Sequence, residues 1–231
     1  MGPDDAHGQQ PPSPLAGGAE AEGALPLLAP DLCVYERYLS VYGRRVGYPG
    51  GGEVAFDVVG HPRCAFRFVT VFPWDRERKE VTLVREFAQG PNASVWSLPT
   101  GGFSEAAHGA LGEGGLLAAA RAELAEEARL EGGAWHCLLP DGHGGLSEGK
   151  WCLNRFVPFV VSGARPMAAA EAPMRDAEEE LMEVHTVSLE RLESILFGAP
   201  GQGGDAAGEM LPPSAVTCHR ALRWLRQQGQ I

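Results

Sequence analysis

Residues 98–102 read Leu-Pro-Thr-Gly-Gly, and residues 120–130 read Ala-Arg-Ala-Glu-Leu-Ala-Glu-Glu-Ala-Arg-Leu. A Gly- and Glu-rich segment joins the two stretches, so the sequence predicts a glycine turn that leads into an acidic helix. Side chains three and four positions apart share a helix face, so Glu123, Glu126 and Glu127 project together. The remaining face can turn inward through the apolar residues Leu116, Leu117, Leu124 and Leu130.

The shared helix face gathers negative charge, because three carboxylates repel one another unless a positive group joins them. Mg²⁺ is a hard cation that pairs one or two carboxylates with substrate phosphates and bound water. The preceding turn could expose backbone carbonyls beside these carboxylates. The pattern therefore predicts metal-assisted phosphoryl chemistry. The alternative is that the glutamates form the solvated face of an amphipathic helix, as in many acidic helices.

These residues resemble the Nudix hydrolases, which carry a Gly turn, an acidic loop and a helix written Arg-Glu-x-x-x-Glu-Glu-x-Gly. In that family the glutamates hold Mg²⁺ or Mn²⁺, and Glu123, Glu126 and Glu127 fall on the pattern. The resemblance covers most of residues 34–228 and best matches the ADP-ribose and nucleotide-sugar pyrophosphatase branch. It implies an α/β fold, namely a Nudix α/β/α sandwich with a mixed sheet and N-terminal antiparallel strands.

The segments before and after this motif, which we call the box, also resemble those of this branch. Residues 81–87 resemble its strand before the turn, and residues 144–148 followed by 156–161 resemble its Gly-Ser-Glu segment and next strand. An acidic loop at residues 176–180, a strand at 181–187 and a final helix at 214–227 also have counterparts. A helix is expected near residues 189–196, before a Gly-rich surface loop.

The box departs from the family pattern at both ends of its helix. Ala122 replaces the family's Arg, and Arg121 points about 100° around the helix from the expected direction. Arg129 replaces the Gly that ends the helix, so we expect the helix to run on to a left-handed cap at Gly132 or Gly133.

Three further departures concern the loop and the substrate. The chain before Glu123 is longer than the usual spacing, so the loop acid could be Glu105 or Glu113. Ala88 stands where an Arg often contacts phosphate, and Ser97 stands where a Glu often precedes the Leu-Pro turn. The sequence therefore leaves the base and the sugar of the substrate open.

The resemblance implies roles for individual residues. The metal ligands would be Glu123, Glu126 and Glu127, together with a backbone carbonyl near Gly101. The general base would come from the acidic loop after the box, where Glu180 is the best match and Glu178 and Glu179 are alternatives.

Three other side chains are candidates for substrate binding. Arg85 and Arg155 could contact phosphate bidentately, and Trp96 could stack on a base. Surface solvation of both arginines and core packing of the tryptophan are the alternatives.

Composition narrows the class of partner. The 231 residues are 44% hydrophobic with a formal net charge of −11, which argues against sequence-independent binding to nucleic acid or an acidic membrane. No apolar run reaches the length of a membrane span, the N-terminus is acidic, and the five cysteines have no Cys-x-x-Cys pair. We expect a cytoplasmic protein with reduced, mostly buried thiols.

The chain divides into a tail and one domain. Residues 1–30 are rich in Pro, Gly and Ala and are expected to be disordered, and residues 31–231 are expected to form a Nudix domain. Strand-like stretches at residues 33–46, 54–59 and 64–71 begin that domain. The resembling branch often forms dimers through such strands, which makes a homodimer a plausible assembly.

Three functional hypotheses follow. The first is a pyrophosphatase dependent on Mg²⁺ or Mn²⁺ that acts on a nucleoside diphosphate sugar of the ADP-ribose or ADP/UDP-sugar type. The second is a catalytically silent Nudix-like nucleotide-binding module, motivated by Ala122, Ala88 and Ser97. The third is an interaction protein whose acidic helix is only a surface.

Overall fold

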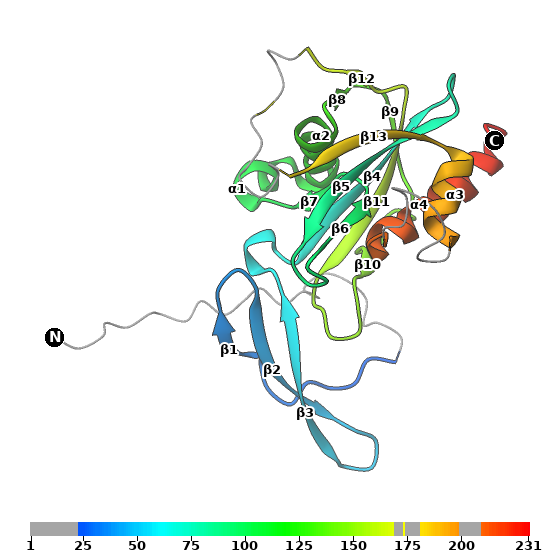
Figure 1. The fold of residues 1–231 in the computed structure, drawn as a ribbon. Coiled ribbons are helices and arrows are strands. Elements are labelled where there is room, and N and C mark those ends of the chain that lie inside the picture. Colours follow the sequence, from blue (N-terminus) through cyan, green and yellow to red (C-terminus); the bar gives the residue numbers. More distant parts are fainter. Residues whose placement is uncertain (1–22, 169–172, 174–180, 199–208) are drawn as a thin grey trace.

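A mixed β-sheet with helices on both faces forms the body of the molecule (Figure 1). The computed structural model describes residues 23–168, 173, 181–198 and 209–231. The sheet runs in the order β10-β11-β4-β5-β13, with β6 paired to β5, β7 to β4 and β9 to β11. Its strands are β4 (Arg67–Asp75), β5 (Glu80–Ala88), β6 (Ala93–Ser97), β7 (Thr100–Gly102), β9 (Ala134–Cys137), β10 (Leu146–Ser147), β11 (Arg155–Ser162) and β13 (Glu183–Ser188).

The helices cover the two faces of this sheet. One face carries α1 (Glu105–His108), the 3₁₀ helix η2 (Gly109–Gly114) and α2 (Gly115–Ala128). The other face carries α3 (Leu189–Phe197) and α4 (Pro212–Gln227). A two-stranded sheet of β8 (Leu130–Glu131) and β12 (Arg165–Pro166) lies beyond the end of α2.

Two apolar clusters hold the helices to the sheet. Alternate residues of a strand point to opposite faces, so Val69 and Val71 of β4 pack under α2 while Phe72 and Trp74 pack under α4. Strands β4 and β11 pair in parallel, and the other strand pairs of the large sheet are antiparallel. The predicted α/β/α sandwich with a mixed sheet and N-terminal antiparallel strands is confirmed.

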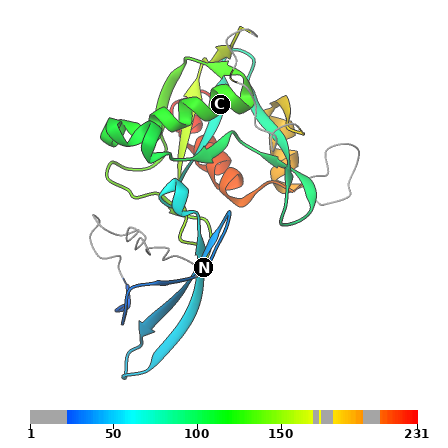
Figure 2. The ribbon, with the colours of Figure 1, turned by 90° about the vertical axis from the view of Figure 1, so that its left-hand side faces the viewer.

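A separate antiparallel sheet projects from this body (Figures 1 and 2). It consists of β1 (Leu32–Glu36), β2 (Ser40–Gly47) and β3 (Glu53–Gly60), and the 3₁₀ helix η1 (Pro62–Cys64) leads from it into β4. The Val59 N–H donates to the Trp151 carbonyl at 2.8 Å, and the Leu153 N–H donates to the Val59 carbonyl at 2.7 Å. These backbone bonds tie the end of β3 to the loop before β11.

The structured chain begins before the predicted start of the domain. The Gly47 N–H donates to the Pro26 carbonyl at 2.9 Å, and the Leu28 N–H donates to the Arg45 carbonyl at 3.0 Å. The expectation of disorder is therefore wrong for residues 26–28, and residues 1–22 lie outside the described part of the chain. Composition does not predict the pairing of residues 26–28 with β2, because backbone groups form these hydrogen bonds and the side chains are not involved.

Helix α2 also ends earlier than predicted. Arg129 itself adopts the left-handed conformation, with φ 58° and ψ 35°, and its N–H donates to the Leu124 carbonyl. The chain then enters β8 directly, and Gly132 and Gly133 use their positive φ in the turn toward β9. The expectation of a longer helix is wrong because Arg129 takes the cap conformation that Gly usually takes.

The cap makes a testable prediction. Left-handed backbone costs a residue with a Cβ about 1–2 kcal/mol, and glycine avoids this cost. Both Arg129→Gly and Arg129→Ala remove the same side-chain contacts, including the hydrogen bond from the guanidinium to the Pro173 carbonyl. They differ in the backbone cost, so we expect Arg129→Gly to be more stable than Arg129→Ala by about 1 kcal/mol. Urea denaturation of the two variants measures the difference, and equal midpoints would contradict the prediction.

None of the helices in the described residues combines the length and the apolar character needed to span a membrane. Of the five cysteines, only Cys218 is buried, and Cys33 is exposed, so the prediction that most are buried is wrong.

Candidate active site

The predicted glycine turn is a short strand that runs close beneath α2. Strand β7 pairs with β4, with Gly101 opposite Val69. A Cβ added at Gly101 would lie 1.9 Å from Oε1 of Glu123, so no side chain other than hydrogen leaves room for that carboxylate. Gly101 does not have positive φ. The glycine therefore leaves room for the Glu123 carboxylate beside β7, and does not serve a special backbone conformation.

Glu127 is buried beside the same strand. Its side chain is 7% exposed, and its Oε2 accepts a hydrogen bond from the Thr100 N–H at 2.9 Å. A buried carboxylate is costly without such a partner. The simple alternative of a solvated acidic face therefore fails for Glu127. Glu123 and Glu127 instead lie against consecutive residues of β7.

The donor set has the right chemistry for a hard divalent cation. Glu123, Glu126 and Glu127 offer carboxylate oxygens, and Gly101 adds a carbonyl oxygen on the strand next to Glu123. In the described part of the chain, no group of three or more His, Cys, Asp or Glu side chains is arranged to hold a metal ion. The Glu127 Oε2 accepts a hydrogen bond from the Thr100 N–H. Binding of a cation would therefore require the carboxylates of Glu123, Glu126 and Glu127 to move closer together.

A thiol lies at the edge of this site. A Cβ added at Gly102 would lie 2.3 Å from the Cys64 Sγ, so the second glycine of the pair also allows a close approach. Burial raises the pKa of the Cys64 thiol, and the negative charge of nearby Glu123 raises it further. Cys64 therefore stays neutral near neutral pH and adds no negative charge beside the carboxylates.

Ser214 on α4 connects the far side of the sheet to the acidic helix. Its Oγ accepts from the Leu98 N–H at 3.0 Å, and the Leu98 carbonyl accepts from the Thr100 hydroxyl at 2.7 Å. The Thr100 N–H then donates to Glu127. This series of bonds fixes the strand that positions Glu127. The sequence offered no signal for Ser214 beyond its place after Pro212 and Pro213 in the first turn of a helix.

Ser97 belongs to the same network and faces the core. It is 1% exposed, and its Oγ lies 3.1 Å from the Ser214 Oγ. Its Oγ also donates to the Leu98 carbonyl at 3.1 Å. The departure from the family's Glu at this position therefore places a small hydroxyl between β6 and α4.

The network predicts unequal effects for its two serines. Ser214→Ala removes the acceptor of a buried Leu98 N–H, which costs about 1–3 kcal/mol. Ser97→Ala leaves that N–H paired with Ser214, so it is expected to cost less, about 1 kcal/mol. Thermal and urea denaturation of both variants measure the difference. A larger loss for Ser97→Ala than for Ser214→Ala would contradict this assignment.

Trp96 lies in the core. It is 4% exposed, and its ring meets the His185 ring edge-on with centroids 5.0 Å apart. The Arg85 guanidinium carbon lies 5.6 Å from the Trp96 ring centroid. The burial agrees with the alternative of core packing, and the ring presents no open face to a base in this structure. Arg85 is partly exposed, and its contact with phosphate stays a prediction.

Arg155 holds a loop. Its Nε donates to the Gly144 and Gly145 carbonyls, both at 3.1 Å, and its Nη2 donates to the Gly145 carbonyl at 2.6 Å. The guanidinium therefore organises the segment before β10, and its contact with phosphate also stays a prediction. Glu180, like its alternatives Glu178 and Glu179, lies outside the described residues.

Arg121 does not take the place of the missing box arginine. Its guanidinium carbon lies 5.9 Å from the Trp135 ring centroid, on an exposed part of α2. This agrees with the offset of one position expected from the sequence.

Comparison with known proteins identifies the family. The NUDIX domain model matches residues 66–207, which is more than half of the chain, whereas no curated protein matches its sequence. The crystal structure of an ADP compounds hydrolase superposes with a TM-score of 0.62 at 16% identity, covering 90% of this chain and 97% of that chain. At this identity the likeness supports the fold alone. On the strength of the domain match and the acidic helix beside β7, the chain belongs to the Nudix hydrolase family.

Proposed function

We propose that the protein hydrolyses the diphosphate linkage of a nucleoside diphosphate sugar of the ADP-ribose or ADP/UDP-sugar type. The products would be a nucleoside monophosphate and a sugar phosphate. The observation that carries the proposal is the placement of Glu123 and Glu127 against Gly101 and Thr100. The structural neighbour is an ADP compounds hydrolase, and this is the reason for choosing this substrate class in the proposal.

The cation would be Mg²⁺ or Mn²⁺, held by Glu123, Glu126 and Glu127 and the Gly101 carbonyl. When bound, it would neutralise phosphate oxygens and lower the pKa of an attacking water. The Thr100 N–H orients Glu127, and Gly101 leaves space for Glu123. Glu180 would accept the proton of the water, with Glu178 or Glu179 as alternatives. Arg85 and Arg155 would bind the diphosphate.

A substrate panel tests the proposal. Purified protein is incubated with Mg²⁺ or Mn²⁺ and ADP-ribose, ADP-glucose, UDP-glucose, a diadenosine polyphosphate or a nucleoside triphosphate, and nucleoside monophosphate release is measured. We expect metal-dependent release from a nucleoside diphosphate sugar. Release from the triphosphates alone would overturn the substrate class, and no release from any compound would favour the silent module.

The second candidate is a catalytically silent nucleotide-binding module. It is favoured by Ala122, which cannot orient a carboxylate, and by Arg121, which contacts Trp135 instead. Metal affinity measured by calorimetry together with turnover separates the two candidates. Binding without turnover across the panel would support the silent module.

We also propose a cytoplasmic homodimer that forms through the N-terminal sheet. Strand β1 is exposed throughout, and Leu32 and Val34 are 68% and 57% exposed. Apolar side chains grouped on one strand favour a protein contact. We expect sedimentation to give a dimer mass and Val34→Glu to give a monomer, whereas Val216→Glu on α4 keeps the dimer. A monomeric wild-type protein would refute the proposal.

A further inference from the structure

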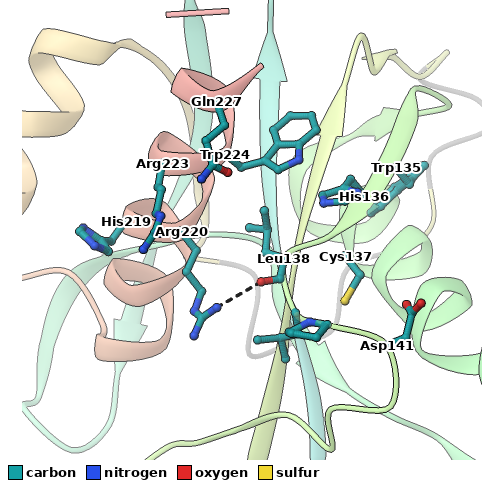
Figure 3. A pocket seen from close by; sticks show the side chains of 12 residues that line it. Trp135, His136, Cys137, Leu138, Asp141, His219, Arg220, Arg223, Trp224 and Gln227 are labelled. Carbon is teal, nitrogen blue, oxygen red and sulfur yellow. Dashed lines mark hydrogen bonds between the residues drawn. The ribbon is translucent and has the colours of Figure 1, made fainter. Parts of the chain in front are cut away.

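A groove lies between α4 and the segment that contains β9, away from the acidic helix (Figure 3). Its volume is about 890 Å³, which falls within the range of pockets that hold small ligands. Helix α4 covers the face of the sheet opposite to α2, because their buried residues belong to the two separate apolar clusters. The groove is therefore distinct from the candidate active site.

An aromatic pair forms one part of this groove. Trp135 and Cys137 of β9 pack toward α2, whereas the intervening His136 turns toward α4. The His136 ring stacks on the Trp224 ring with a centroid separation of 4.9 Å and an interplanar angle of 22°. Figure 3 shows the two rings approaching each other from β9 and α4. His136 is exposed and Trp224 partly exposed, so ring surface remains open to a planar ligand.

Basic side chains of α4 form the other part. Arg220, Arg223 and His219 line the groove, and among the described residues that line it Asp141 is the one acid. The Arg220 Nη1 donates to the Leu138 carbonyl at 3.2 Å, which fixes this guanidinium across the groove and leaves further N–H donors for a ligand. This local excess of positive groups contrasts with the formal charge of −11 of the whole chain. The lining therefore favours an anion.

We propose that this groove is a second, non-catalytic site that binds a nucleoside phosphate. The base would stack on the His136 and Trp224 pair, and the phosphate would accept hydrogen bonds from Arg220 and Arg223. Stacking surface and arginine forks placed in one groove match the two halves of such a ligand. The site makes no use of the acidic helix, so this inference does not depend on the proposed hydrolysis.

Calorimetric titration with AMP in the presence of EDTA tests the proposal. We expect wild-type protein to bind AMP, and Arg223→Gln to weaken that binding about tenfold because one guanidinium contact is lost. The matched control is Arg226→Gln on the same helix, which removes the same charge outside the groove. Arg226 instead lies 3.7 Å from Glu193. This control is expected to bind like the wild type.

Further measurements distinguish binding in the groove from binding in the active site. They also compare the contributions of the base and the phosphate of the ligand. Glu127→Gln is expected to leave AMP binding in EDTA unchanged, and His136→Ala, at an exposed position, is expected to weaken it. Adenosine and inorganic phosphate are each expected to bind more weakly than AMP. The proposal is overturned if AMP does not bind, if Arg223→Gln binds as the wild type does, or if Glu127→Gln abolishes binding.

Discussion

Glu127→Gln is expected to reduce kcat/KM for metal-dependent hydrolysis by about 10³-fold, which corresponds to about 4 kcal/mol of transition-state stabilisation. The change removes the negative charge of a buried carboxylate that we propose as a metal ligand. It keeps the shape of the side chain and an acceptor for the Thr100 N–H, so the fold is expected to remain intact. Turnover of the preferred substrate and metal affinity by calorimetry are both measured. Each should fall.

The control for this variant is Glu190→Gln. Glu190 is an exposed acid in the first turn of α3, so its replacement removes the same charge from a helix on the other face of the sheet. We expect this control to keep full turnover and metal affinity. If Glu127→Gln keeps wild-type metal affinity and turnover, Glu127 is not a ligand and its burial serves only to anchor β7.

The sequence was sufficient for features that depend on local pattern. Residues 81–87 and 156–161, which resemble strands of the family branch, lie in β5 and β11, and the spacing of Glu123, Glu126 and Glu127 predicted the acidic face of α2. Such patterns are local because strand and helix periods repeat within a few residues. The resemblance then supplied the order of layers, which the pattern alone leaves open.

The sequence was insufficient where distant segments meet. The hydrogen bond between Ser214 and Leu98 joins residues far apart in the chain, and no local pattern encodes it. The burial of Trp96 likewise depends on the pairing of β6 with the segment near Met210. At Arg129, which accepts from the Met167 N–H and donates to the Pro173 carbonyl, the helix ends despite the unfavourable backbone conformation. Tertiary context overrides local preference at each of these positions.

Gly101 gives the sharpest test of how β7 and α2 form the site. Gly101→Ala would place a Cβ 1.9 Å from the Glu123 carboxylate, so that carboxylate must move. The colliding atoms are the end of a flexible side chain, so we expect a loss of stability below about 1 kcal/mol. Displacing a ligand by about 1 Å costs about 10²-fold in rate, so kcat/KM is expected to fall by about that factor.

Gly90→Ala is the matched control. A Cβ at Gly90 meets nothing within 4 Å, and its backbone lacks positive φ, so this variant is expected to keep both stability and turnover.

A double-mutant cycle with Glu123→Gln then isolates the cause. If Gly101 acts by leaving room for Glu123, Gly101→Ala should cost little further activity once the Glu123 carboxylate has been replaced. Losses that simply multiply in the double variant would show that Gly101 acts independently of Glu123. In that case Gly101→Ala would act by shifting β7, and with it the Gly101 carbonyl. The role of the glycine would then be to keep β7 in place.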